Sequence, residues 1–283
     1  PGALHVVGDD ETLFRIAVRH DVALRSLMTA NQISNPALVY PGQELLIPGT
    51  GSGRLPAPVE SVDVHPLPVA QGGTLVIDVR TTEPVTLTGR LFDRPVRFAE
   101  EDGVYYGLAG VHVFTEPGLH ELTLAATDNG GRHIELTASV VVEAGQFNYE
   151  RIKASPSLLD PAVVAAEQER IDALRSTFTA TRLWSGELHP PGTGSISSYF
   201  GTRRAYNQGP YTSYHGGVDL RGPTGAPVYA PAAGTVVFAD SLTVRGNALM
   251  LDHGWGVLTG YWHLSEIELG VGEEALGGEL VGD

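Results

Sequence analysis

The first 49 residues combine two hydrophobic periods, one typical of strands and one of helices. The short apolar runs "LHVV" and "ELLIP" open and close this stretch, as two paired strands would. Between these runs the apolar residues recur at helical spacing: Leu13, Ile16 and Ala17 first, then Leu24, Leu27 and Met28. The pattern predicts a strand, two short helices and a returning strand. Asp10 is expected to cap the first helix, and the second is expected to end at Asn31.

Residues 60–147 alternate apolar and polar positions in short runs. Five such runs are "TLVIDVR", "VTLTGRLF", "YYGLAGVHVF", "HELTLAATD" and "IELTASVVVE". The separators "EPG" and "DNGG" have turn chemistry, so we expect an immunoglobulin-like antiparallel β-sandwich. A linker rich in Gly, Ser and Pro precedes it, over residues 49–60. His112, His120 and His133 have no acidic partner at ligand spacing, and we interpret them as packing or surface residues.

A helical period returns in residues 155–182, which we interpret as a linker helix. Asp160 suits the N-cap and Pro161 the first helical position. The apolar residues at helical spacing are Val164, Ile171, Leu174 and Phe178. Glu167 and Arg170 lie one turn apart, and we expect them on the exposed side. Strand patterns divided by glycine turns follow this helix. The chain is therefore expected to be mainly β and to contain several domains.

The net charge of the chain argues against some classes of binding partner. The 283 residues include 18 Lys and Arg against 33 Asp and Glu, which gives a formal net charge of -15. This charge would repel a nucleic-acid backbone or an anionic membrane surface. The chain has no cysteine, which excludes disulfides and thiolate metal sites. The sequence contains no run of 18 or more apolar residues that could span a bilayer. Its first residues do not have the pattern of a signal peptide, so we expect that any such segment has been removed or lies upstream.

The stretch "YHGGVDL" contains the first candidate chemistry. His215 and Asp219 lie four residues apart across two glycines and a valine, so an extended backbone could turn both to one face. An imidazole and a carboxylate together suit Zn²⁺. This spacing alone is a weak signal, and two protein ligands do not complete a zinc site. His189 or His253 are candidate third ligands within the chain.

The N-terminal pattern resembles a LysM domain, a small module that binds glycans containing N-acetylglucosamine. The matching pieces are "HVV", "TLFRIA", "LMTANQI" and "VYPGQELLIP". The resemblance implies glycan binding, with Thr12, Ile33 and Leu38 as candidate contacts. The sequence departs from the family at Asp10-Glu11, where Gly-Asp is usual, which could alter the loop beside the glycan groove. The alternative is a degenerate module that serves only as a spacer.

The C-terminal hundred residues resemble the LytM/lysostaphin-type zinc peptidases of family M23. The matching pieces are "FGTRR", "YHGGVDLRGPTGAPVYAPAAGTV", "GN", "LDHGWGV" and "YWHLSEI". The resemblance implies that His215 and Asp219 bind zinc and that His263 acts as a general base or stabilises the transition state. His253 also matches a recurrent family position, and we interpret it as a hydrogen-bonding or packing residue. The family's final H-x-H motif, which supplies the third zinc ligand, is absent here and is expected shortly past Asp283.

Further site residues follow from the same resemblance. A tyrosine upstream of the first ligand assists catalysis in some members, and Tyr206, Tyr211 and Tyr214 are the candidates here. Tyr206, Tyr211 and Asn247 are also the candidate substrate-binding residues. In such enzymes zinc polarises the scissile carbonyl and lowers the pKa of water from about 15.7 toward about 7. Without the H-x-H motif, the 283 residues alone are expected to be inactive or nearly so.

The complete resemblance implies an exported cell-wall hydrolase. We expect a LysM domain over residues 1–49, the β domain over 60–147, the linker helix over 155–182 and an incomplete peptidase domain over 183–283. The expected activity is zinc-dependent hydrolysis of the peptide cross-links of peptidoglycan. We expect the protein to be a monomer that is anchored to glycan strands in the periplasm, the cell wall or outside the cell. The alternative is a non-catalytic LytM-type protein that binds peptidoglycan or activates another hydrolase. An upstream domain could also inhibit the site.

Overall fold

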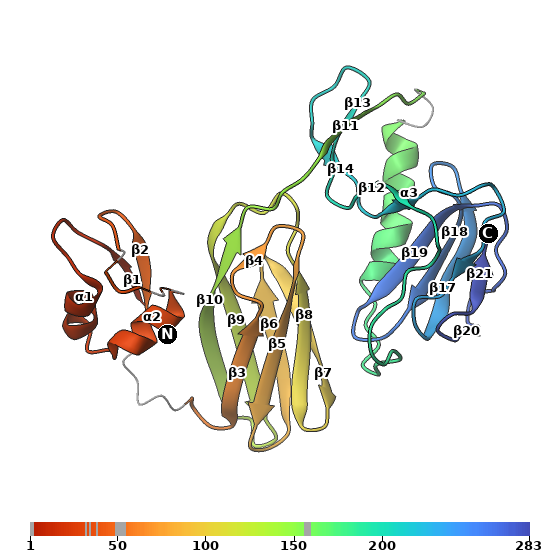
Figure 1. The fold of residues 1–283 in the computed structure, drawn as a ribbon. Coiled ribbons are helices and arrows are strands. Elements are labelled where there is room, and N and C mark those ends of the chain that lie inside the picture. Colours follow the sequence, from red (N-terminus) through yellow and green to blue (C-terminus); the bar gives the residue numbers. More distant parts are fainter. Residues whose placement is uncertain (1–2, 32, 34, 38, 49–54, 156–159) are drawn as a thin grey trace.

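The computed structural model describes residues 3–31, 33, 35–37, 39–48, 55–155 and 160–283. Its fold is mainly β, as expected, and is divided into successive parts along the chain (Figure 1). A small α+β region comes first, an eight-stranded β region follows, and a single longer helix leads into the C-terminal β region. Among the described residues, no helix has the length and apolar character needed to cross a membrane.

The N-terminal region has the predicted strand–helix–helix–strand order. Its elements are β1 (Ala3–Val6), α1 (Leu13–Arg19), α2 (Leu24–Ala30) and β2 (Glu44–Ile47). The two strands pair antiparallel, and the helices cover them with a core that includes Leu13, Ile16 and Leu27. Asn31 joins the end of α2 to β2, because its side chain donates to the Leu46 carbonyl and accepts from the Leu46 N–H.

The predicted N-cap of α1 was wrong by two residues. Thr12 caps the helix, and its hydroxyl accepts the N–H of Arg15 at 3.3 Å. Asp10 lies in the preceding turn instead, with a left-handed backbone φ of 62°. This is the position at which the LysM pattern usually has glycine, a residue that adopts positive φ without steric cost.

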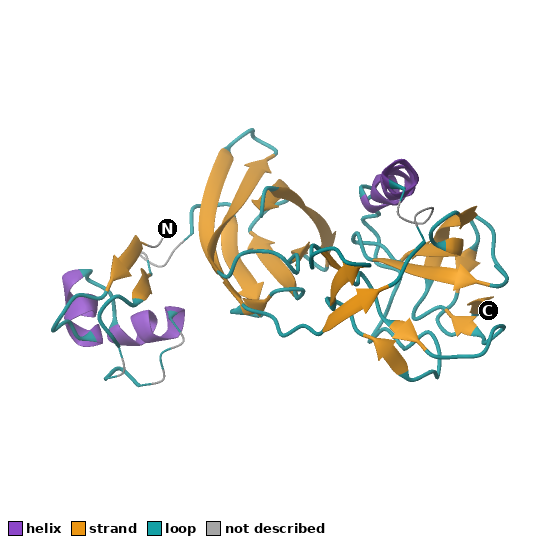
Figure 2. Cartoon of the chain, turned by 90° about the horizontal axis from the view of Figure 1, so that it is seen from above, coloured by secondary structure: helices purple, strands orange, loops and turns teal. Residues whose placement is uncertain are grey.

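The β region is one continuous eight-stranded sheet, which corrects the predicted sandwich of two separate sheets. Its strands are β3 (Val59–His65), β4 (Val69–Ala70), β5 (Thr74–Thr81), β6 (Val85–Leu91), β7 (Arg94–Glu101), β8 (Val104–Gly110), β9 (Gly118–Asp128) and β10 (His133–Glu143). Their spatial order is β3-β5-β8-β7-β6-β9-β10-β4, and the sheet curls into a nearly closed barrel (Figure 2). Only the β10–β4 pair is parallel.

Strand β7 explains why the alternating pattern did not reveal the barrel. Its first half, 94–97, pairs with β6, whereas its second half, 98–101, pairs with β8. One strand therefore turns the corner between two groups that would otherwise be separate sheets. Along β7 the buried residues Val96 and Ala99 lie three positions apart, so the alternation breaks at the corner. One such break in the sequence does not distinguish the two arrangements. The barrel core includes Leu75, Ile77 and Leu122, each fully buried.

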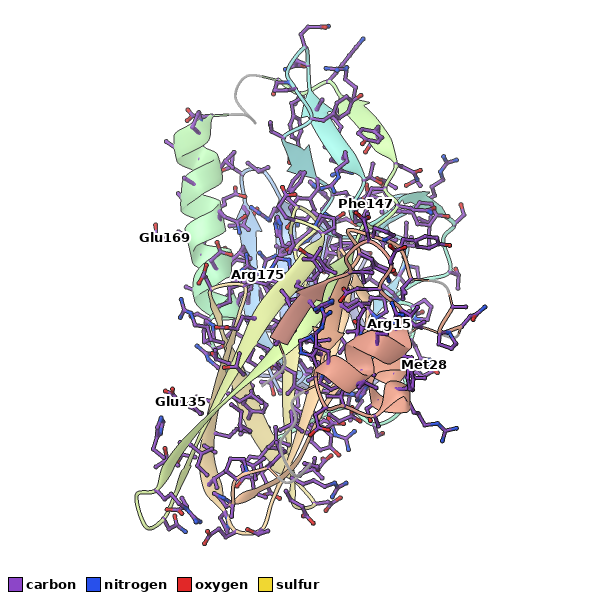
Figure 3. The ribbon with its side chains drawn as sticks, turned by 90° about the vertical axis from the view of Figure 1, so that its left-hand side faces the viewer. Arg15, Met28, Glu135, Phe147, Glu169 and Arg175 are labelled. Atoms are coloured by element: carbon purple, nitrogen blue, oxygen red, sulfur yellow. The ribbon has the colours of Figure 1, made fainter. Side chains whose placement is uncertain are left out.

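The predicted helix is α3 (Pro161–Arg175), and the Asp160 side chain caps it by accepting the Ala162 N–H at 2.9 Å. Ile171 is its buried anchor against the C-terminal sheet. The exposed position expected for Glu167 was wrong. Its carboxylate is buried, accepts the Val244 N–H at 2.7 Å and pairs with Arg245 at 3.1 Å. The neighbouring Glu169 is exposed instead and points outward from α3 (Figure 3).

The C-terminal region consists of four small sheets. The largest contains β17 (Gly234–Leu242), β18 (Gly246–Asp252), β19 (Leu258–Leu264) and β20 (Glu274–Ala275), in the order β19-β18-β17-β20. A second sheet contains β11 (Tyr149–Ile152), β13 (Arg203–Tyr206) and β14 (Ser213–Tyr214). The remaining pairs are β12 (Ile196–Ser198) with β15 (Asp219–Leu220), and β16 (Val228–Tyr229) with β21 (Leu280–Gly282).

The barrel and the C-terminal region share an aromatic junction. The Arg203 guanidinium lies between the rings of Phe114 and Phe147, 4.1 and 4.5 Å from their centroids, and donates to the Val113 carbonyl at 2.7 Å. Because cation–π contacts gain strength when shielded from water, Arg203 helps to fix the two parts together.

Candidate metal centre

The two predicted metal ligands meet in the structure. His215 follows β14 and Asp219 begins β15, and the two strands belong to different sheets. The pair Gly216-Gly217 makes the turn between them, so the residues are not on one extended strand as the spacing alone suggested. The His215 Nε2 atom lies 3.0 Å from the Asp219 Oδ1 atom. The diglycine turn therefore brings an imidazole nitrogen and a carboxylate oxygen to one point.

This separation fits a shared zinc ion. Two ligands of a tetrahedral Zn²⁺, each at about 2.0–2.2 Å, lie roughly 3.3–3.5 Å apart. An outward shift of a few tenths of an ångström would bring His215 and Asp219 to that spacing. The imidazole is buried, whereas the Asp219 side chain is 52% exposed, so the pair faces solvent on its carboxylate side. The chain thus offers two donors of the right kind with an accessible side.

The other ring nitrogen of His215, Nδ1, lies within hydrogen-bond distance of two oxygen atoms. This atom lies 3.1 Å from the Ser198 hydroxyl and 3.2 Å from the Tyr199 carbonyl oxygen. A carbonyl oxygen only accepts, so this contact favours the tautomer with the proton on Nδ1. With the proton on Nδ1, Nε2 would supply its lone pair to a metal placed between it and Asp219 Oδ1, whereas without a metal a proton on Nε2 would satisfy the same 3.0 Å contact. Ser198 could not be predicted from the sequence, because a serine in "SISSYFG" matches no ligand motif.

His263 is not brought into this pair. It lies near the end of β19 at a β-bulge, where Trp262 and His263 together oppose Ala248 of β18. Its backbone φ of 61° is left-handed, its side chain is exposed, and its N–H donates to the Arg245 carbonyl at 2.8 Å. Bulges of this kind redirect a side chain and are frequent beside active sites. The catalytic role of His263 stays a prediction.

Neither in-chain candidate for the third ligand joins the pair. His253 is fully buried, and its ring nitrogens contact the Ala233 carbonyl at 2.7 Å and the Thr259 hydroxyl at 2.8 Å. It is therefore a hydrogen-bonding core residue, as interpreted from the sequence. His189 is exposed, and its backbone N–H donates to Pro231. Within the described ranges, no three His, Cys, Asp or Glu side chains gather at one point.

The three candidate tyrosines lie in the segment of chain just before His215. Tyr214 directly precedes His215, and its ring makes edge contacts with His112 and Phe114 of the barrel. Tyr211 packs against Tyr149 with ring centroids 5.2 Å apart, whereas Tyr206 ends β13. Burial and the charges of Arg94 and Arg203 lower the pKa of His112. His112 is thus a packing residue at the junction, as interpreted.

Asn247 lies on β18 beside the His263 bulge. Its side-chain amide donates to the Ser265 carbonyl at 3.2 Å, and its register partner is Leu264. This contact places Asn247 next to His263, but the structure gives no contact between Asn247 and the pair. Its role in substrate binding stays a prediction.

The candidate glycan contacts fall into different environments. Thr12 is the N-cap of α1, and Ile33 is half-buried against the N-terminal core. Leu38 lies outside the described residues. The first two therefore have structural roles already, and their part in glycan binding stays a prediction.

Comparisons with known proteins give matches for the N-terminal region and for the C-terminal region that contains the pair. Residues 213–283 match the model of peptidase family M23, and residues 5–48 match that of the LysM domain. The peptidoglycan DD-endopeptidase ShyA of Vibrio cholerae is 34% identical over 87 residues, which cover 31% of this chain and 20% of that protein. The DD-carboxypeptidase/endopeptidase Mpg of Neisseria meningitidis is 41% identical over 68 residues, which cover 24% of this chain and 16% of that protein.

A solved structure extends the likeness beyond the matched segments. The crystal structure of a candidate M23 peptidase from Pseudomonas aeruginosa aligns with a TM-score of 0.55 at 26% identity, covering 76% of this chain and 82% of that one. The chain thus joins a glycan-binding type of module to a peptidase type of module. Its N-terminal segment is a LysM domain and its C-terminal segment belongs to peptidase family M23.

Proposed function

We propose that this chain is part of a zinc metalloendopeptidase that hydrolyses the peptide cross-links of bacterial peptidoglycan in the periplasm, the cell wall or outside the cell. The observation that carries the proposal is the meeting of His215 Nε2 and Asp219 Oδ1, 3.0 Å apart, within the segment that matches family M23. By their descriptions, ShyA is a peptidoglycan DD-endopeptidase and Mpg is a DD-carboxypeptidase/endopeptidase. The chain spans a fifth or less of their lengths, so their activity supports this proposal by analogy.

The residues of this chain have distinct parts in the proposed reaction. His215 and Asp219 would hold the metal, with Nε2 and Oδ1 as donor atoms. A bound Zn²⁺ would polarise the scissile carbonyl and lower the pKa of a nearby water. His263, at its redirected bulge, would hold or transfer a proton at the scissile amide, an effect typically worth about 10²–10⁴ in rate. A third ligand is expected from an H-x-H motif, and the 283 residues contain none.

The LysM domain would hold the catalytic part close to its polymeric substrate. Binding to glycan strands raises the effective concentration of the peptidase domain at the neighbouring peptide stems. The -15 charge makes nonspecific electrostatic attachment to the anionic polymers of a cell envelope unfavourable, so specific glycan recognition would have to supply the anchoring.

Metal binding and hydrolysis test the first part of the proposal. We expect His215→Ala and Asp219→Ala to abolish Zn²⁺ binding in calorimetric titrations, whereas the exposed His133→Ala leaves binding unchanged. Digestion of purified sacculi should require an H-x-H motif after Asp283, and the 283 residues alone should release little soluble peptide. Zinc binding that survives both ligand substitutions would contradict the proposal.

Binding to sacculi tests the proposed anchoring by the LysM domain and helps to distinguish the enzyme from the non-catalytic alternative. The protein should sediment with purified sacculi, and soluble N-acetylglucosamine oligomers should compete. If the protein with an H-x-H motif binds sacculi and zinc but releases no peptide, the non-catalytic alternative, a peptidoglycan-binding protein or an activator of another hydrolase, replaces the enzyme.

A further inference from the structure

A hydrogen-bonded network of three side chains lies behind His215 and Asp219. The Arg204 guanidinium is its centre, with a side chain only 15% exposed. Its Nε atom donates to Glu150 Oε2 at 3.1 Å, and its Nη2 atom donates to the Ser198 hydroxyl and to Asp219 Oδ2, each at 3.2 Å. Ser198 in turn contacts His215 Nδ1 at 3.1 Å. The network therefore touches both proposed metal ligands.

The donors and acceptors of this network are consistent with a proton on His215 Nδ1. Arg204 can only donate, and the Glu150 carboxylate accepts. The Ser198 hydroxyl lies 3.3 Å from Glu150 Oε2, so it can donate its proton to Glu150 and accept from Arg204 and His215. His215 then carries its proton on Nδ1, as the Tyr199 carbonyl also requires. A proton on Nδ1 leaves Nε2 to face Asp219 Oδ1, where a bound cation could take the place of a proton between the two atoms.

The same network determines which oxygen of Asp219 is available. Arg204 occupies Oδ2, whereas Oδ1 faces His215 Nε2 at 3.0 Å. Because Arg204 already binds one carboxylate oxygen, only the other oxygen is available to coordinate a metal ion. Glu150 offsets the positive charge of Arg204, so the three charged groups, Glu150, Arg204 and Asp219, leave a net charge of about -1 that favours a cation.

We propose that Arg204 and Glu150 are positioning residues of the metal site, which orient Asp219 directly and His215 through Ser198. This inference rests on the proposed function of His215 and Asp219 as zinc ligands. Arg204 lies on β13, and Glu150 is its register partner on β11, the strand that connects the barrel to α3. The ligand geometry thus depends on the pairing of a connecting strand that lies outside the segment matched to family M23.

The test measures zinc affinity and the visible spectrum of the Co²⁺-substituted protein. Outer partners of metal ligands typically contribute about 10–100-fold in affinity. We expect Arg204→Gln to weaken Zn²⁺ binding by that factor and to change the Co²⁺ absorption bands, whereas Arg204→Lys restores part of the affinity. The control is Arg221→Gln, which removes the same charge from an exposed residue two positions after Asp219. It should bind zinc like the parent protein.

Glu150→Gln and Ser198→Ala provide a second route if Arg204→Gln lowers the melting temperature strongly. Each should weaken zinc binding, and the double variant Glu150→Gln/Arg204→Gln should lose less than the sum of the single losses, because the two residues act as one unit. The outcomes separate the two proposals. Unchanged affinity and spectrum in all these variants, with His215→Ala still abolishing binding, would overturn the positioning role alone. A parent protein that binds no zinc would overturn the metal site and the positioning role together.

Discussion

The indole ring of Trp255 stacks on the phenol ring of Tyr106, with centroids 4.9 Å apart and planes inclined by 18°. Tyr106 belongs to β8 of the barrel, and Trp255 to the turn between β18 and β19 of the C-terminal region. Close by, Arg182 pairs with Glu101 at 2.8 Å and lies 5.2 Å above the Trp255 ring. With the Arg203 contacts at the other end of the junction, this stack fixes the barrel against the peptidase region at two separate points.

Removal of this stack should uncouple the two parts. Aromatic pairs contribute about 0.5–1.5 kcal/mol beyond the area they bury. We expect Tyr106→Ala to divide a shared thermal transition into two in calorimetry and to speed proteolysis near the junction. Tyr106→Phe keeps the ring and should behave like the parent. A single unshifted transition in Tyr106→Ala would mean that the stack does not couple the parts.

Replacement of Asp10 by glycine should stabilise the LysM domain. Asp10 has a φ of 62°, at which a side chain costs energy and glycine does not. We expect Asp10→Gly to raise the free energy of unfolding by about 0.5–1 kcal/mol in urea titrations. Asp9→Gly is the matched control, because Asp9 is not among the residues with positive φ. It should give no gain, and equal effects of the two substitutions would refute the backbone explanation.

Glu11 should make the stability of the LysM domain depend on pH. Its carboxylate accepts the Gly8 N–H at 2.9 Å, contacts His5 Nε2 at 2.6 Å and pairs with Arg19. These contacts, led by the Gly8 hydrogen bond, lower the pKa of Glu11 from 4.5 to about 2. The stabilisation is thus complete above pH 4.5 and is lost as the pH falls toward 2.

The Glu11→Gln variant tests this dependence. It should be less stable than the parent at pH 6, and the difference should shrink between pH 4.5 and 2.5 in denaturant titrations. A difference that stays constant over this range would show that the carboxylate charge is not responsible.

His263 should show a conflict between stability and activity. A non-glycine residue at a φ of 61° stores strain of order 1 kcal/mol. We expect His263→Gly to raise the melting temperature of the protein while hydrolysis of sacculi, in the form with an H-x-H motif, falls at least about 100-fold. His263→Ala should lose the same activity without the gain in stability. Full activity in either variant would exclude a catalytic role.

Local chemistry made much of the fold predictable from the sequence. The helical spacing of Leu13 and Ile16 and the capping chemistry of Asp160 depend on neighbouring residues, and the structure confirms both. The position of Glu167 was missed because its partner, Arg245, lies 78 residues further along the chain. The barrel was missed because a single break in the alternation of β7, between Val96 and Ala99, does not indicate which strands pair on either side of it.

The candidate site was predictable where a motif carried it and not elsewhere. The H-x-x-x-D spacing identified His215 and Asp219, and the structure brings them together. Arg204 and Glu150 belong to no ligand motif. They reach the pair only because β11 aligns with β13, and such a pairing between distant segments leaves no periodic signal in either one.

The two edges of the barrel come from one short stretch of chain. β3 forms one edge and β4 the other, and only residues 66–68 separate them, two of which are prolines without an N–H to donate. The seam is therefore tethered covalently at one end, so the two edge strands stay close even where no ladder of hydrogen bonds joins them.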